Sequence, residues 1–141
     1  MAEVLARREA ADRKWGSIEV RSAGTAASNG APASDGALRA AQRHGLDLSA
    51  HRSSPLTPED VRQADLILTM SGHHLVRVAE MGGGDRATLL TAFAAGDEAS
   101  HAPESITDPI GGSDKEYEHT FTLLETLVRR AFDRLRPLVA P

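Results

Sequence analysis

Apolar side chains recur along the chain with different periods, and each period predicts a type of element. From Lys115 to Leu135 the apolar residues fall at i, i+3 and i+4 spacing, which is the pattern of an amphipathic helix. The run from Leu66 to Met70 is almost continuously apolar, which is typical of a strand buried on both faces of a parallel sheet. Between Ile18 and Ser22 apolar and polar residues alternate, and this favours a short strand.

Capping residues mark the limits of the remaining predicted helices. Thr57 followed by Pro58 is a favourable helix start, Ser71 is predicted to cap another helix, and Gly45 is suited to the residue after a helix end. These signals predict helices over about 1–15, 35–44, 57–64 and 71–82, and a further strand from Ala87 to Phe93. Because strands alternate with helices, we expect one α/β domain, residues 1–141, with a parallel sheet.

Composition and charge narrow the class of protein. With 141 residues, 40% of them hydrophobic, the chain has enough material for one core. A net charge of -4 and a pI of about 5.8, without any basic cluster, predict no nucleic-acid partner. No apolar run approaches the ~20 residues of a membrane span, so we expect no membrane partner and a cytoplasmic location. The absence of cysteine excludes disulfides, thiolate metal sites and thiol chemistry carried by this chain.

The spacing of the histidines does not favour a metal site. His73 and His74 are adjacent on a predicted helix, where neighbouring side chains point about 100° apart and do not easily share one ion. His51, His101 and His119 have no spaced partner that resembles a ligand set, so we expect surface positions for them. The sequence therefore predicts no metal and no cofactor.

The segment from Thr107 to Asp114 closes a polar loop and opens the last predicted helix. Pro109 fixes its own φ and favours an extended conformation for Asp108, while Gly111 and Gly112 allow the backbone to turn. Such a segment is consistent with a simple loop that ends in a helix cap. An aspartate held on a loop edge also suits a general acid that must reach a leaving group.

Three segments, Val20–Thr25, Ala64–Met70 and Asp108–Ser113, occur in an order and at a spacing that resemble the low-molecular-weight protein tyrosine phosphatases. The Ser-Ser-Pro-Leu-Thr run that ends at Thr57, and the Gly-Gly-Ser after Asp-Pro, are most similar to the bacterial branch that includes protein-arginine phosphatases. The likeness begins at Met1 and extends to the last helix. It implies a three-layer α/β/α fold with a parallel sheet, and a phosphorylated protein or small phosphomonoester as substrate.

The resemblance carries over to individual residues. Asp108 matches the general acid that protonates the leaving group, and Ser22 matches a serine that supports the phosphate-binding loop by hydrogen bonding. Ile110 stands where many members carry an aromatic residue that lines the substrate pocket, and this departure weakens the implied selectivity for phosphotyrosine. Tyr117, in the first turns of the last helix, either borders that pocket or packs in the core.

The family's chemistry centres on a C-x5-R-S/T loop between its first strand and first helix. The cysteine thiolate of that loop attacks phosphorus to give a phosphocysteine, and its arginine and N–H groups hold the phosphoryl oxygens. Pro-Met-Ala-Glu follows the loop in many members, and this chain starts at Met1-Ala2-Glu3. We therefore expect a domain truncated at its N-terminus, without the first and central strand, and inactive as written. A non-catalytic binding or regulatory module and an arsenate-reductase-like relative, which also requires cysteines, are the alternatives.

Overall fold

The computed structural model describes residues 1–25, 29–96 and 105–139. The elements follow one another as α1 (Ala2–Asp12), α2 (Asp35–Arg43), α3 (Pro58–Gln63), β1 (Ile67–Thr69), α4 (Gly72–Glu80), the 3₁₀ turn η1 (Gly84–Arg86), β2 (Ala87–Leu89), α5 (Leu90–Ala95) and α6 (Asp114–Val139). Across these ranges, no helix is both long and apolar enough to cross a bilayer.

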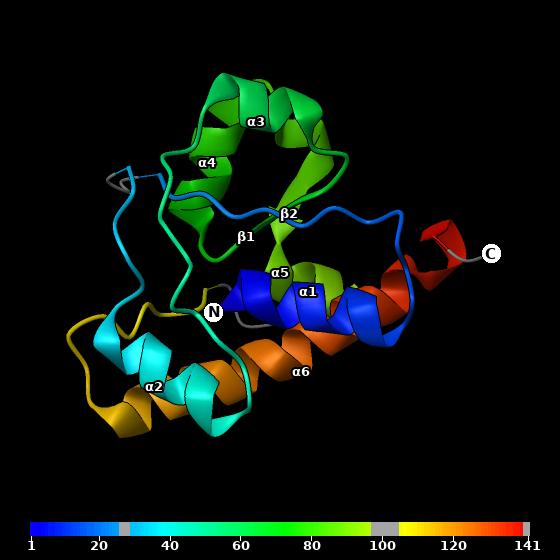
Figure 1. Ribbon diagram of the computed structural model, residues 1–141. Helices are drawn as coiled ribbons and strands as arrows, with labels where there is room; N and C mark the ends of the chain where they lie inside the picture. The colour runs from blue at the N-terminus through cyan, green and yellow to red at the C-terminus, as the bar shows by residue number, and fades with distance from the viewer. Residues whose placement is uncertain (26–28, 97–104, 140–141) are drawn as a thin grey trace.

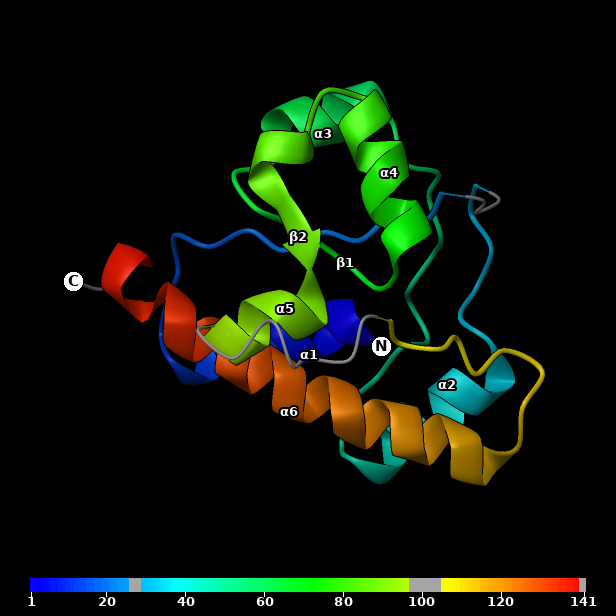
Figure 2. The same ribbon diagram turned by 180° about the vertical axis from the view of Figure 1, so that it is seen from behind.

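The two strands β1 and β2 form a parallel pair, in register from Ile67 opposite Ala87 to Thr69 opposite Leu89. Helices α3 and α4 lie on one side of this pair, and α1, α5 and α6 lie on the other side (Figures 1 and 2). The layered arrangement and the parallel pairing confirm the α/β fold class predicted from the alternation of strands and helices. Parallel strands need a crossover connection, and α4 with η1 supplies it here.

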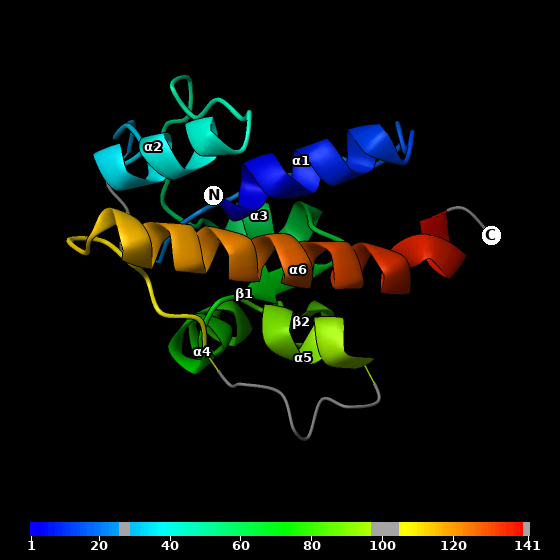
Figure 3. The ribbon, with the colours of Figure 1, turned by 90° about the horizontal axis from the view of Figure 1, so that it is seen from below.

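Helix α6 forms the centre of the core. It runs past α1, α2 and α5 and contacts all three (Figure 3). Ser113 begins the helix, because its Oγ accepts a hydrogen bond from the Glu116 N–H at 3.2 Å. The apolar spacing seen in the sequence is the buried face, so the prediction of an amphipathic helix is confirmed and the helix extends to Val139. The side chains of α6 with the least exposure are Tyr117, Phe121, Leu124, Leu127, Val128, Ala131 and Phe132.

The predicted strand from Ile18 to Ser22 is wrong. The segment is extended and crosses the molecule at the level of β1 and β2 (Figure 1), but among the described residues it has no ladder of hydrogen bonds with another strand. Its only bridge lies just beyond it, where Gly24 pairs with Pro55. Alternation of apolar and polar residues favours an extended backbone, but a strand also needs a partner. No neighbouring strand is available to this segment within the described residues.

The predicted strand from Ala87 to Phe93 is only partly correct. The strand ends at Leu89, and the following residues form α5 instead. Leu90 and Ala94 lie four positions apart, and both are buried in the core cluster that α6 contributes to. A short apolar run is compatible with either period, so the contact between α5 and α6 decides the outcome.

All three predicted cap positions are confirmed, and one of them, Ser71, lacks the side-chain hydrogen bond of a cap. Thr57 and Asp60 form a reciprocal capping box, with the Asp60 N–H 3.1 Å from Thr57 Oγ1 and the Thr57 N–H 3.0 Å from Asp60 Oδ2. Gly45 has a φ of 74° just after the end of α2, as predicted. Ser71 precedes α4, but its side chain makes no capping hydrogen bond because its hydroxyl is engaged by two histidines.

Candidate active site

The loop that carries Asp108 is anchored at the carboxyl end of β1. The Ile106 N–H donates to the Met70 carbonyl oxygen at 2.8 Å, and the Ile106 side chain is buried. Asp108 follows this anchor by two residues, and Ser71, just before α4, follows Met70 directly. One backbone hydrogen bond therefore brings the loop next to the start of α4, in a region where parallel α/β sheets commonly place functional residues.

The carboxylate of Asp108 is oriented by its own loop. Its Oδ1 accepts a hydrogen bond from the Ile110 N–H at 3.1 Å, which is an Asx turn. The Gly112 N–H donates to the Pro109 carbonyl oxygen at 2.7 Å, and Gly111 adopts a φ of 79° to allow this turn. Asp108 is exposed, and no described residue hydrogen bonds to its Oδ2. Oδ2 is thus free to carry a proton toward a bound molecule.

Asp108 also lies close to the N-terminal end of α1. Burial lowers the pKa of the Met1 α-amino group, and the negative charges of Glu3 and Asp108 oppose this shift. His51 approaches the same end, with its Nδ1 3.5 Å from Glu3 Oε2. The sequence predicts a surface position for His51, but only 25% of its side chain is exposed. The positive end of a helix dipole and several titratable groups therefore meet the Asp108 loop.

Two histidines at the start of α4 share one hydroxyl group. Ser71 Oγ lies 2.8 Å from His73 Nδ1 and 3.1 Å from His74 Nδ1. Burial and the neighbouring His73 lower the pKa of His74, and the charge of Asp108 partly counteracts them. The predicted solvated helix start is correct for His73, which is exposed. His74 is half-buried, and the charge of Asp108 acts on it. Among the described residues, no cluster of three His, Cys, Asp or Glu side chains has the geometry of a metal site.

Ser22 lies on the extended segment, away from the contacts of the Asp108 loop. Its carbonyl oxygen accepts a weak hydrogen bond from Ser54 Oγ at 3.4 Å, and the Gly24 N–H donates to the Ser54 carbonyl oxygen at 3.0 Å. These contacts hold the end of the segment against the irregular stretch before α3. They fix the position of the Ser22 backbone, while the role of its hydroxyl group stays a prediction.

Ile110 and Tyr117 have opposite environments. Ile110 is 72% exposed on the turn that holds Asp108, so its side chain is available to a ligand. Tyr117 is 4% exposed, and its hydroxyl group lies 3.0 Å from Ser34 Oγ at the start of α2. The Tyr117 ring packs directly against Gly36. The contacts of Tyr117 are those of a packing residue, which was one of the two roles left open by the sequence.

Sequence reasoning did not select Glu3, His51, Ser71 or His74 as parts of the site. The signal for the last two was present, because a serine three positions before a histidine places both side chains on one turn of a helix start. No such signal exists for Glu3 and His51, which lie far apart in the sequence and meet only in the folded chain.

The chain is similar to known proteins in both sequence and structure. The family model for low molecular weight phosphotyrosine protein phosphatases matches residues 1–138. The protein-arginine-phosphatase of Bacillus subtilis is 36% identical over 138 residues, covering 96% of this chain and 87% of the relative. The low molecular weight protein-tyrosine-phosphatase Wzb of Escherichia coli is 32% identical over 113 residues, covering 80% and 74%. A crystal structure of a YwlE mutant from Bacillus subtilis superposes with a TM-score of 0.84 at 32% identity, covering 96% and 88%.

Proposed function

The chain belongs to the low molecular weight phosphotyrosine protein phosphatase family, and from this membership we propose that Asp108 is the general acid of a reaction that removes a phosphoryl group from a protein side chain. The observation that carries the proposal is the geometry of the Asp108 carboxylate. It is exposed, it is oriented through Oδ1 by the Ile110 N–H, and it lies beside the N-terminal end of α1.

In this reaction a thiolate attacks phosphorus and the bond from phosphorus to the leaving group breaks. Asp108 donates the proton that the leaving group takes up, and the phosphoryl group stays on sulfur as a phosphocysteine. The same carboxylate then accepts a proton from the water that attacks phosphorus, and this step releases inorganic phosphate and the thiolate. The sequence contains no cysteine, so residues 1–141 supply the acid and base but not the nucleophile.

We therefore propose that residues 1–141 are a domain truncated at its N-terminus and inactive as written. Two structural features support this. The segment from Ile18 to Ser22 is extended without a strand partner, and β1 pairs with β2 along only one of its edges within the described residues. A strand lying between them would satisfy the backbone groups of both.

A phosphorylated protein or a small phosphomonoester is the proposed substrate, and the cytoplasm is the proposed compartment. Similarity to a protein-arginine-phosphatase supports phosphoarginine as the phosphorylated side chain. The aliphatic Ile110, exposed on the Asp108 turn, supports the same choice because it cannot stack on a phenol ring as an aromatic side chain would. Phosphotyrosine is the competing choice, supported by similarity to the tyrosine phosphatase Wzb.

The absence of cysteine favours one alternative, a non-catalytic module that binds or regulates without turnover. The arsenate-reductase-like alternative gains no support, since it too depends on cysteines.

Hydrolysis of para-nitrophenyl phosphate tests the proposal. Residues 1–141 should release nitrophenol no faster than the buffer. The same residues preceded by the first strand and C-x5-R loop of the Bacillus subtilis relative should turn over. In that extended chain Asp108→Asn should reduce turnover by ~10²–10⁴-fold. Asp114→Asn is the matched control, because this exposed aspartate pairs with Arg39 instead of facing the site.

Three outcomes would contradict the proposal. Vanadate-sensitive turnover by residues 1–141 that disappears in Asp108→Asn would show that the chain supplies its own nucleophile. Equal turnover of the extended chain with and without Asp108→Asn would assign the acid to another group. A folded extended chain without activity would favour the non-catalytic module.

A further inference from the structure

Asn29 and Gly30 form an exposed turn in the loop between the extended segment and α2. Asn29 is the only asparagine in the sequence, and asparagine is one of the chemically labile residues. Its side-chain amide is lost when the backbone nitrogen of the next residue attacks Cγ, and a Cβ atom on that residue hinders the attack. Gly30 has no Cβ, and no atom lies within 4 Å of the position that a Cβ would take. The approach to Asn29 is therefore sterically open.

The attacking nitrogen is nevertheless engaged in the folded chain. The Gly30 N–H donates to the Ser53 carbonyl oxygen at 2.7 Å, and the Ser53 N–H donates to the Ala31 carbonyl oxygen at 2.7 Å. Gly30 and Ala31 thus oppose a single residue, and Gly30 has a φ of 81°. This arrangement is a β-bulge that begins with a left-handed glycine. Attack on Asn29 requires the Gly30 nitrogen to leave its hydrogen bond and lose its proton, so the bulge opposes the reaction.

The bulge is held by hydrogen bonds at the surface. The Ala31 N–H donates to Ser53 Oγ at 3.1 Å, and Pro32 pairs with Arg52 in an isolated antiparallel bridge. No residue of this contact, from 29 to 32 or from 52 to 53, is fully buried. Surface contacts of this kind open at a lower free energy than the core unfolds. Opening of the bulge therefore releases the Gly30 nitrogen while α6 and its contacts stay folded.

We propose that Asn29 is a site of spontaneous deamidation and that opening of the bulge sets its rate. In the open form a base takes the proton of the Gly30 N–H, and the nitrogen attacks Asn29 Cγ. A C–N bond forms, the side-chain nitrogen takes up a proton and leaves as ammonia, and a cyclic imide remains. Water then breaks one of the two C–N bonds of the imide, which gives either aspartate or the β-linked isoaspartate at position 29. This modification lies apart from Asp108 and does not depend on the phosphatase reaction.

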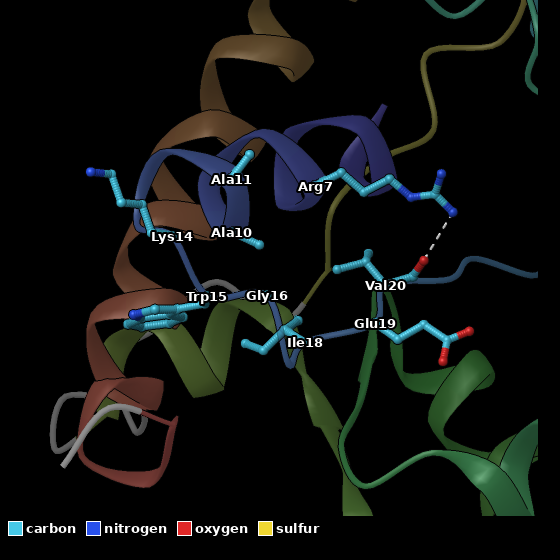
Figure 4. A pocket seen from close by; sticks show the side chains of 9 residues that line it. All are labelled: Arg7, Ala10, Ala11, Lys14, Trp15, Gly16, Ile18, Glu19 and Val20. Atoms are coloured by element: carbon cyan, nitrogen blue, oxygen red, sulfur yellow. Dashed lines mark hydrogen bonds between the residues drawn. The ribbon is translucent and has the colours of Figure 1, made fainter.

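The isoaspartate product does not fit the present bulge. Its main chain runs through the side-chain carbon and is longer by one carbon atom, so the Gly30 N–H and the Ala31 carbonyl oxygen no longer face Ser53 together. The extended segment has an anchor of its own, because the Val20 carbonyl oxygen accepts a hydrogen bond from Arg7 Nη2 at 3.0 Å (Figure 4). We therefore expect the bulge to be lost while the extended segment stays in place.

The rate of ammonia loss tests the proposal. Residues 1–141 and a synthetic peptide of residues 24–35, which lacks Ser53, are kept in the same mildly alkaline buffer. Mass spectrometry follows the replacement of the side-chain NH₂ group by OH. The peptide should deamidate, and the full chain should react at least about tenfold more slowly because two backbone hydrogen bonds must break first. In guanidinium chloride, which opens the bulge, the full chain should react as fast as the peptide.

Three variants of the full chain separate the site from the bulge. Ser53→Ala removes the side-chain acceptor of the Ala31 N–H and should speed deamidation severalfold. Ser54→Ala is the matched control, because its hydroxyl group donates to the Ser22 carbonyl oxygen at 3.4 Å and is not part of the bulge. Asn29→Gln should show no mass change, since the longer side chain does not readily form the cyclic imide.

Several results would overturn the proposal. A peptide that keeps its amide, or a full chain that keeps it in guanidinium chloride, would show that Asn29 is not a reactive site. Equal rates for the folded chain and the peptide, or for Ser53→Ala and Ser54→Ala, would show that the bulge does not control the reaction. A mass change that persists in Asn29→Gln would assign the reaction to a glutamine.

Discussion

Replacing Gly36 by alanine tests the packing role of Tyr117. A Cβ atom on Gly36 would lie 2.3 Å from Tyr117 Cδ2 and Cε2 and 2.7 Å from Cζ. Carbon atoms pack at ~3.5–4.0 Å, so either the ring or α2 must move by more than 1 Å, roughly. The ring has little freedom, because it is 4% exposed and its hydroxyl group is held 3.0 Å from Ser34 Oγ.

Two opposing contributions decide the sign of the change in stability. Alanine in place of glycine within a helix is worth about 0.8–1.0 kcal/mol on propensity alone. Overpacking a filled site costs about 1–3 kcal/mol, and loss of the hydrogen bond between Tyr117 and Ser34 adds about 1 kcal/mol. The unfavourable contributions exceed the favourable one, so we expect Gly36→Ala to lower the free energy of unfolding by about 1–3 kcal/mol. For a domain stable by ~5–15 kcal/mol this is a large fraction.

Urea unfolding followed by circular dichroism measures this change. Gly72→Ala at the start of α4 is the matched control, because no atom lies within 4 Å of the added Cβ, and its stability should stay equal or rise by up to ~1 kcal/mol. Tyr117→Leu added to Gly36→Ala should recover part of the loss by vacating the contacted volume. A Gly36→Ala variant as stable as Gly72→Ala would refute the reasoning, because the ring would then not be held against α2.

The polar groups of α6 and α4 give two predictions on titration. Hydrogen bonds from His44 and Arg43 lower the pKa of Glu118, so its contribution to stability is present above the unfolded pKa and is lost as pH falls below about 4.5. Glu118→Gln should flatten the stability profile measured by urea unfolding in that range, and an unchanged acid limb would contradict the assignment. The Asp108 charge raises the pKa of His74 against the stronger effect of burial, so Asp108→Asn should lower the pKa of His74 further when its ring signals are titrated by NMR. If the pKa of His74 were unaltered or higher in Asp108→Asn, the charge of Asp108 would not act on His74 as we infer.

The sequence by itself determined the features that depend on neighbouring residues. The capping box at Thr57, the positive φ of Gly45 and the apolar face of α6 follow from interactions within about one turn of the chain, and all three were predicted. The turn around Asp108 is of the same kind, because Pro109 and Gly111 restrict the backbone locally and let the carboxylate reach the Ile110 N–H. Local chemistry was therefore sufficient to predict the turn, whereas the role of Asp108 came from the resemblance to the family.

Tertiary structure decided the features that depend on a partner distant in sequence. The segment from Ile18 to Ser22 has the composition of a strand, but no strand of the described part of the chain lies next to it, so its backbone forms no ladder there. Leu90 begins a helix because α6 offers an apolar surface at helical spacing. Asp108 lies near His74 and the end of α1 because tertiary contacts hold its loop, among them the hydrogen bond between Ile106 and Met70 and the burial of the Ile106 side chain. Contacts across such separations carry no periodic signal, because each depends on how the whole chain packs.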